Sequence, residues 1–193
     1  MEVVQKKGKI KYTFSFEQDK LNYAYEESTE KGDIDLYYGD LSKKSSEFIE
    51  QNEWLRNVGL LWIVIGVFQS VYGSITRESL YIDLMWILIG AACLAWSVIS
   101  KVTYTIYKTD NARLHIIHDK QHDAIVNELM SRRKAQLLAW YADVNVDNDL
   151  TNEINKFKWL AEQEVLTEEE SKQKIEEAKF YHQQQGDEER VLN

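Results

Sequence analysis

The sequence predicts an α+β membrane protein. A small antiparallel sheet with one capping helix is split by a two-helix transmembrane hairpin and is followed by a C-terminal helical hairpin. Two long apolar stretches stand close together near the middle of the chain, with alternating apolar and polar residues on both sides of them. Downstream, the alternation changes to the period of an amphipathic helix. We therefore expect two halves of one cytoplasmic domain, the hairpin that separates them, and an acidic helical tail: residues 1–56 and 101–138, residues 57–100, and residues 139–193.

The two apolar stretches, residues 57–75 and 80–100, are long enough to be membrane spans. The first has no formal charge in 19 positions, and the second contains only Asp83 in 21. About 20 apolar residues in a helix cross the roughly 30 Å of a hydrocarbon core. Residues 76–79 provide only a tight link, so both flanks lie on the same side of the membrane. Two buried helices of a soluble core are the alternative, but the flanks lack the amphipathic partners that would cover them.

The distribution of basic residues predicts the side on which the flanks lie. Lys and Arg are frequent outside the two spans, whereas only Arg77 lies in the link. By the positive-inside tendency, we expect a multi-pass protein of the cell inner membrane with both termini in the cytoplasm. The single cysteine, Cys93, lies in the second span and excludes a disulfide framework within one chain, which fits a reducing compartment.

Small residues recur along both spans and predict where helices pack. They are spaced four residues apart, at Gly66, Ser70 and Ser74 in the first span and at Ala91 and Ala95 in the second. Small side chains let helix backbones approach closely in lipid, where packing drives association. This stripe serves either the hairpin itself or contact with a second copy of the protein.

Alternation with a period of two predicts strands on both sides of the hairpin. Ile10, Tyr12, Phe14 and Phe16 share one face of the first such segment. The same pattern returns in four further segments: residues 21–25, 34–38, 101–108 and 113–118. Short groups of strands need a covering element to be stable, so we expect all five to form one small sheet.

Two further segments predict helices outside the membrane. Residues 42–56 are polar, with Phe48, Ile49 and Leu55 spaced for a helix that leads into the first span. From Gln121 onward, an apolar stripe has the period of a helix that caps the sheet; its residues are Ile125, Val126, Leu129, Met130, Leu137 and Leu138.

This order of elements resembles the bacterial pleckstrin-homology-like (PH-like) membrane proteins, in which a transmembrane hairpin interrupts or adjoins a small PH-like barrel. The resemblance covers about 95 residues and is one of pattern; it lies in the following segments: Phe14-Ser15-Phe16, Leu21-Asn22-Tyr23, Leu36-Tyr37-Tyr38-Gly39-Asp40-Leu41, Tyr104-Thr105-Ile106-Tyr107, Ala112-Arg113-Leu114 and the helix over 125–133. It implies a recognition or scaffold domain rather than an enzyme, and it supplies no ligand signature at particular positions.

The tail resembles the short bacterial C-terminal helical hairpin known as SHOCT. The resemblance lies in Phe157-Lys158-Trp159-Leu160, Val165-Leu166-Thr167-Glu168-Glu169-Glu170 and Lys174-Ile175. Thr167 and Glu170 have the spacing of a capping box. Val165 and Ser171 depart from the pattern, which has glycine and an aromatic residue there. An ordinary capped acidic helix is the alternative. The resemblance implies an oligomerising or partner-docking tail, for which we expect contacts through Phe157, Trp159, Leu160, Leu166 and Ile175.

Charge and the remaining polar residues limit the function further. Residues 139–193 carry 6 basic and 14 acidic side chains, and nothing in the chain suggests a nucleic-acid partner. Arg132, Arg133 and Lys134 form the densest basic cluster, which either contacts lipid headgroups or is a solvated helix face. A wet strand-to-helix turn accounts better than a metal site for the histidines of this region, which are His115, His118 and His122. We expect no metal and no cofactor.

The sequence therefore favours a non-enzymatic integral inner-membrane protein. Its PH-like domain and acidic tail are expected to act as a scaffold or docking module for self-assembly, for a protein partner or for lipid headgroups. The alternative function belongs to bacterial conflict, as an immunity protein that shields the membrane from a toxin or as a defence effector that permeabilises it.

Overall fold

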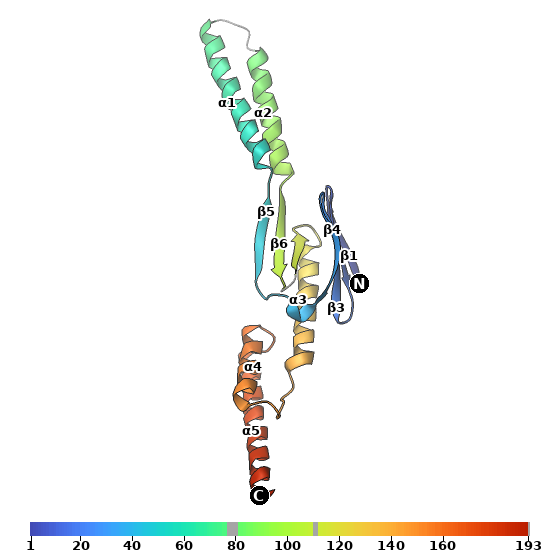
Figure 1. Ribbon diagram of the computed structural model, residues 1–193. Coiled ribbons are helices and arrows are strands. Elements are labelled where there is room, and N and C mark those ends of the chain that lie inside the picture. The colour runs from blue at the N-terminus through green and yellow to red at the C-terminus, as the bar shows by residue number, and fades with distance from the viewer. Residues whose placement is uncertain (77–80, 110–111, 193) are drawn as a thin grey trace. The chain divides into compact units, whose positions relative to one another are not determined.

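The computed structural model describes residues 1–76, 81–109 and 112–192 (Figure 1). Most of the predicted link at 76–79, the first residue of the second predicted span and the predicted turn at 110–111 lie outside the described residues. The elements follow in the order β1 (Glu2–Lys7), β2 (Ile10–Phe16), β3 (Lys20–Glu26), β4 (Lys31–Tyr37), the 3-10 helix η1 (Tyr38–Asp40), β5 (Ser45–Glu50), α1 (Glu53–Thr76), α2 (Tyr81–Ile99), β6 (Val102–Lys108), β7 (Arg113–Ile117), α3 (His122–Tyr141), α4 (Leu150–Glu162) and α5 (Glu168–Leu192).

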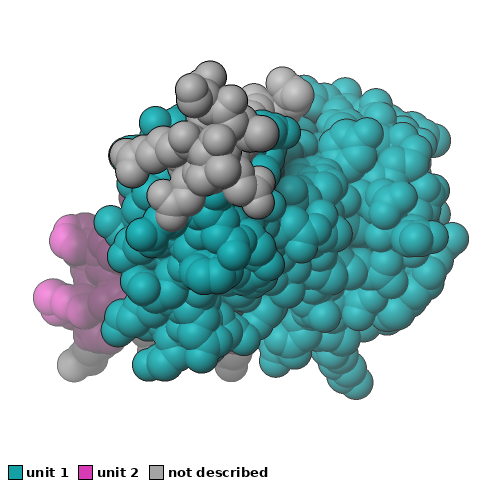
Figure 2. All heavy atoms as spheres, turned by 90° about the horizontal axis from the view of Figure 1, so that it is seen from below, with its two compact units in different colours: residues 1–45, 107–193 teal, residues 46–106 magenta. Residues whose placement is uncertain are grey.

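The chain forms two compact units, residues 1–45 with 107–193 and residues 46–106, which Figure 2 shows in teal and magenta. Its strands form a four-stranded antiparallel sheet in the order β1-β2-β3-β4 and a three-stranded sheet in the order β5-β6-β7. The α+β class is therefore confirmed, whereas the expectation of one small sheet is wrong. Periodicity gives the faces of strands but not how strands group, because partners are chosen by contacts far apart in the chain.

The four-stranded sheet follows from the alternation that the sequence shows. Tyr12, Phe14 and Phe16 of β2 are buried on one face, and Phe14 pairs with Tyr23 in the register of β2 with β3. The two rings lie 5.4 Å apart, centroid to centroid. Cross-strand aromatic pairs of this kind stabilise a sheet.

The first strand, β1, was not predicted, because only Val3 and Val4 are apolar in it. Its middle residue Gln5 is buried, and the side-chain amide bonds to both backbone groups of Ile117. Nε2 donates to the carbonyl oxygen at 2.8 Å, and Oε1 accepts from the amide at 2.8 Å. Nε2 also donates to Asp119 Oδ1 at 2.7 Å. A polar side chain therefore ties β1 to the end of β7.

The predicted helix over 42–56 is wrong in its first part, because residues 45–50 form strand β5. Every residue of β5 is exposed, so no burial pattern distinguishes strand from helix there. The strand is stabilised by a distant partner. Phe48 stacks on Tyr104 with 6.3 Å between ring centroids, and the Tyr104 hydroxyl donates to Glu50 Oε2 at 2.9 Å. Helix α1 begins only at Glu53. The preceding residue, Asn52, caps it, because its Oδ1 accepts from the Leu55 amide at 3.0 Å.

The two predicted spans are helices α1 and α2, which pack against each other within the second unit. α1 is long and apolar enough to cross a membrane, and only 17% of its most apolar window is buried. The apolar part of α2, Leu84–Ile99, is shorter. Trp62 and Trp86 stack in parallel with ring centroids 4.4 Å apart. This ring contact joins α1 to α2.

Glycines form the contact between the two helices. The buried residues of α1 are Gly59, Gly66 and Gly73, spaced seven residues apart. A Cβ added to Gly90 of α2 would lie 2.6 Å from the carbonyl oxygen of Gly59 and 2.9 Å from the Ile63 nitrogen, so the two backbones touch there. Close approach of this kind is what small residues allow in a helix pair.

The predicted small-residue stripe is correct within the hairpin at Gly66 only. Ser74, Ala91 and Ala95 are exposed, Ser70 is half-buried, and the Ser74 hydroxyl donates to the Ser70 carbonyl oxygen at 2.8 Å within α1. The stripe was drawn at a spacing of four residues, whereas the contact follows a spacing of seven, as in helices that cross at a small angle. The second proposed use of the stripe, contact with another copy, stays a prediction.

The predicted C-terminal helical hairpin is present as α4 and α5. The buried side chains of Phe157, Leu160, Val165 and Ala178 form its core together with Leu137 of α3. The capping box is confirmed: the Glu170 amide donates to Thr167 Oγ1 at 3.1 Å, and the Thr167 amide donates to Glu170 Oε2 at 2.7 Å.

The two departures from the SHOCT-like pattern have a local physical reason. Glu164, with φ of 58°, takes the left-handed conformation after α4, and the next residue, Val165, is buried in the core of the tail. Ser171 is buried, and its hydroxyl donates to the Phe157 carbonyl oxygen at 2.9 Å, which joins α5 to α4.

A buried carboxylate holds the α3–α4 connection. Glu153 is fully buried; it accepts from the Asn145 amide at 3.1 Å, from Asn148 Nδ2 at 2.8 Å and from Lys156 Nζ at 2.6 Å. Burial alone would raise the pKa of Glu153, but these hydrogen bonds and the lysine lower it below its ordinary value. The acidic loop before α4 is thus stabilised by a cation from the chain itself.

We predict that Gly90→Ala destabilises the hairpin by about 1–3 kcal/mol, because the added methyl group forces the backbones apart. Thermal unfolding of the purified protein in mild detergent, followed by circular dichroism, measures this. Ala91→Val is the matched control, since position 91 is exposed and should leave the melting temperature unchanged. Equal effects of the two substitutions would contradict the glycine contact.

Candidate functional site

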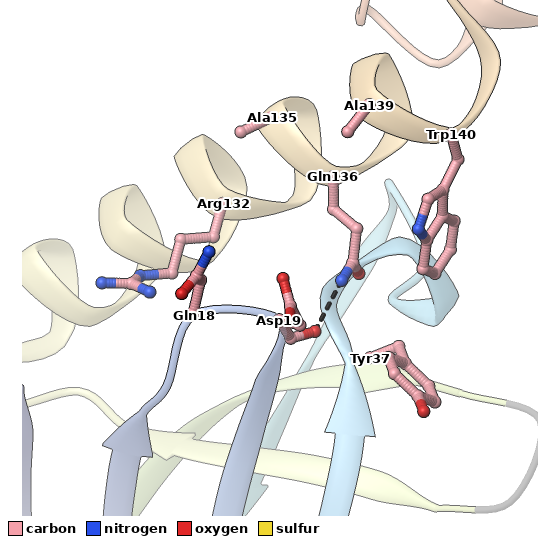
Figure 3. Close-up of a pocket in the computed structure, with 8 residues that line it drawn as sticks. All are labelled: Gln18, Asp19, Tyr37, Arg132, Ala135, Gln136, Ala139 and Trp140. Carbon is pink, nitrogen blue, oxygen red and sulfur yellow. Dashed lines mark hydrogen bonds between the residues drawn. The ribbon is translucent and has the colours of Figure 1, made fainter.

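A pocket of about 560 Å³ lies between the β2–β3 turn, the end of β4 and the outer face of α3 (Figure 3). All of these elements belong to the first unit. Trp140 and Tyr37 lie at one end of the pocket and Arg132 and Gln18 at the other, with Gln136 between them. The lining is completed by Asp19, Ala135 and Ala139. The two alanines keep this face of α3 open.

Two polar side chains hold the walls of the pocket in place. Tyr38 is fully buried, and its hydroxyl lies 2.9 Å from the carbonyl oxygens of both Glu17 and Lys20, at the two ends of the β2–β3 turn. Burial raises the pKa of the Tyr38 phenol, so it remains a donor. Gln136 donates to the Asp19 carbonyl oxygen at 2.5 Å and accepts from the Gly39 amide at 2.7 Å. The turn, η1 and α3 are therefore joined.

Trp140 forms the wall at the C-terminal end of the pocket. A Cβ on Gly39 would lie 2.5 Å from Cζ3 of the Trp140 ring, so the indole packs directly on the backbone of η1. Tyr37 meets the same ring edge to face, with 6.0 Å between centroids. Trp140 is nevertheless 46% exposed and Tyr37 is 54% exposed. Two large rings thus pack against their neighbours while about half of each residue stays exposed.

The accessible rings continue beyond the pocket as an aromatic row, which we define as Tyr37, Trp140, Tyr141 and Trp159. Tyr141 lies 6.1 Å from Trp140 and 5.6 Å from Trp159, both in edge-to-face contacts. Each of the four rings is more than a third exposed. Rigid, half-exposed aromatic side chains are enriched where proteins bind other proteins.

The three residues of the predicted basic cluster differ in exposure: Arg133 is buried, Arg132 is partly buried and Lys134 is exposed. Arg133 is 5% exposed and donates to the Leu41 carbonyl oxygen at 2.7 Å and to Gln163 Oε1 at 2.5 Å. Burial lowers the pKa of its guanidinium. Arg132 donates to Glu128 Oε1 at 2.6 Å and to the Glu17 carbonyl oxygen at 2.5 Å, and lies over the ring of Phe16. Lys134 alone is a solvent-exposed residue.

The arginines were misread because a run of basic residues on a helix usually marks its solvated face. Here the run lies where α3 meets backbone carbonyl oxygens of other segments, and guanidinium groups satisfy them. Their contacts are therefore structural, and they support the pocket from α3.

The predicted tail-docking residues are mostly used inside the chain. Phe157 and Leu160 are fully buried in the core of the tail, and Leu166 and Ile175 pack against that core. Trp159 is the exception, since it is 38% exposed and belongs to the aromatic row. The apolar pattern identified the right residues, but their partner is the end of α3.

The histidines do not converge. His115 stacks on Tyr12, with 6.2 Å between ring centroids, whereas the rings of His118 and His122 lie 4.2 Å apart. Burial lowers the pKa of His115, which lines a smaller pocket of about 270 Å³ with Tyr23, Tyr25 and others. Among the residues that the structure describes, no group of three or more His, Cys, Asp or Glu side chains is placed to hold a metal ion.

Sequence reasoning missed the pocket residues because their role arises from tertiary contacts. Tyr37 and Gly39 are noted only within a segment of the PH-like resemblance. Gln136 carries no role in the predicted helix, and Trp140 follows the end of its apolar stripe. A possible signal was the exposed pair Trp140-Tyr141 on a helix whose apolar stripe was already complete.

Comparison of the chain with protein-family models, with curated proteins and with solved structures finds no match.

We predict that Gly39→Ala displaces the Trp140 ring from the pocket wall, because the methyl group occupies the space of Cζ3. The protein labelled with 5-fluorotryptophan reports this by ¹⁹F NMR, with the Trp140 resonance assigned through Trp140→Phe. The Trp140 resonance should shift, while that of Trp54, on α1, should stay in place. An unchanged Trp140 resonance would show that the ring does not rest on η1.

Proposed function

We propose that this chain is a non-enzymatic, membrane-anchored docking module. The α1–α2 hairpin anchors it in the inner membrane of a bacterium, and the pocket with its aromatic row binds a protein partner on the cytoplasmic side. The observation that carries the proposal is the pair Tyr37 and Trp140, whose rings contact each other and stay about half exposed beside a pocket whose walls are joined by hydrogen bonds of Tyr38 and Gln136.

The outer surface of the hairpin supports the anchor. Apolar side chains on both helices are more than half exposed, which would be a large unfavourable patch in water; they include Leu61, Val64, Phe68, Val71, Ile75, Leu84, Leu88, Trp96, Val98 and Ile99. The core helix of a soluble protein would be mostly buried, whereas α1 is not. Hydrocarbon is the surrounding in which such a surface is stable.

The order of elements supports the PH-like interpretation. Strands grouped as four and three are followed by α3, and the helical hairpin is inserted between β5 and β6. The α4–α5 hairpin with its capping box supports the SHOCT-like interpretation of the tail. Both resemblances imply recognition or assembly.

The tail has a different part in this function from the one expected of it. Its apolar residues are buried against Leu137 of α3, and Lys43 pairs with Glu164 at 2.8 Å beside the Arg133–Gln163 contact. We infer that the tail supports the C-terminal end of α3, where Trp140 and Tyr141 lie. The docking surface then includes Trp159 from the tail itself.

We predict that carbonate at high pH does not extract the protein from bacterial membranes. In a Cys93→Ser background, Thr76→Cys at the end of α1 should react with a membrane-impermeant maleimide added outside the cell. Lys120→Cys should react only after permeabilisation, because two spans place the flanks together in the cytoplasm. Reaction of both positions under the same conditions, or extraction by carbonate, would contradict the anchor.

We predict that a photo-crosslinking residue in place of Ala139, inside the pocket, forms a defined adduct with another protein in native membranes. The same residue in place of Lys172, exposed on α5, is the control and should form none. Trp140→Leu should remove the adduct. Equal adducts from both positions would contradict a docking role for the pocket, and an adduct of twice the chain's mass would replace the partner by a second copy.

A further inference from the structure

The charges around the aromatic row indicate what kind of segment it binds. Asp19 lines the pocket and is exposed. Its carbonyl oxygen accepts the Gln136 bond, so the carboxylate is not used in that contact. An aspartate in the same pocket as Tyr37 and Trp140 favours a cation, by charge and by cation–π attraction.

Arg132, the one cation among the described residues that line the pocket, does not oppose this. The guanidinium of Arg132 is neutralised by Glu128 at 2.6 Å, donates to the Glu17 carbonyl oxygen and lies 5.6 Å from the centroid of the Phe16 ring and 5.7 Å from that of Tyr38. In Figure 3 it lies at the opposite end from Trp140. The Arg132 guanidinium therefore does not occupy the end of the pocket formed by Tyr37 and Trp140.

Acidic residues also follow the row toward the tail. Asp143 comes two residues after Tyr141, and Glu162 three residues after Trp159, and both are exposed. They belong to a segment, residues 139–193, with 14 acidic and 6 basic side chains, a net of −8. Negative charge of this extent attracts a positively charged partner and repels a negative one.

We propose that the partner segment which occupies this surface is basic. A lysine or arginine side chain lies against the exposed parts of Tyr37 and Trp140 and carries its charge toward Asp19, and further basic residues lie along Tyr141 and Trp159. This inference rests on the proposed docking function and names the chemistry of its partner. A second copy of the chain fits poorly, because each copy carries a net charge of −9.

The test is a selection of 12-residue peptides from a random display library on the full-length protein in nanodiscs. Peptides that also bind the Trp140→Leu and Tyr37→Leu variants are discarded. We expect the remaining peptides to be rich in Lys and Arg. Replacing their lysines by norleucine, or Asp19 by Asn, should weaken binding about tenfold in fluorescence anisotropy. Glu169→Gln, an equal loss of charge on α5 away from the row, should change binding less than twofold.

The outcomes separate this inference from the proposed function. Peptides that need Tyr37 and Trp140 for binding but are neutral or acidic would contradict a basic partner and leave the docking site in place. Basic peptides that bind the Asp19→Asn variant as tightly as the unchanged protein would do the same. Basic peptides that bind the Glu169→Gln and Asp19→Asn variants equally weakly would show attraction to the overall charge alone and would also overturn it. Failure to recover any peptide that depends on Tyr37 or Trp140 would overturn both.

Discussion

The architecture of the first unit depends on polar side chains of α3 that bond to the backbone of other segments. Arg132, Arg133 and Gln136 lie within two turns of the helix and reach the carbonyl oxygens of Glu17, Leu41 and Asp19. An apolar residue in place of Arg133 would leave the buried bond to the Leu41 carbonyl oxygen unmade, which costs more than the bond contributes. These bonds therefore fix the helix against the β2–β3 turn and the segment that follows β4. The pocket lies along this face of α3 because Arg132 and Gln136 bond to the neighbouring segments, whereas the small side chains of Ala135 and Ala139 do not fill the space between.

Much of the fold could be predicted from local patterns. Alternation predicts β2 and β3 and the buried faces of Tyr12, Phe14 and Tyr23, and the two long apolar stretches predict α1 and α2 to within a few residues. The patterns failed where a strand has no buried face. β5 is exposed throughout and depends on Tyr104, 54 residues after Glu50, and β1 depends on Gln5 and its distant contact with Ile117. Contacts of such long range leave no periodic signal in a single sequence.

The residues around the pocket were harder to predict than the core. Sequence reasoning treats polar residues on a helix as solvated, so Arg133 was expected at the surface although it is almost completely buried. It treats apolar residues of a short tail as available for a partner, whereas Phe157 and Leu160 bind the end of α3. In the hairpin, the small residues were recognised but their spacing was misjudged, because serine and alanine were counted with glycine. Only glycine permits the backbone contact of Gly59 with Gly90.

The amide of Gln5 has a consequence for how this protein meets other chains. β1 and β7 are the outer strands of their sheets, and unpaired outer strands attract strands from other molecules. At Ile117 both backbone groups of β7 are already bonded, because the glutamine side chain imitates the missing neighbour. The same residue projects from β1 and keeps that strand against its own molecule. One glutamine thus occupies the two backbone groups of Ile117 to which a strand of another molecule would bond at this end of β7.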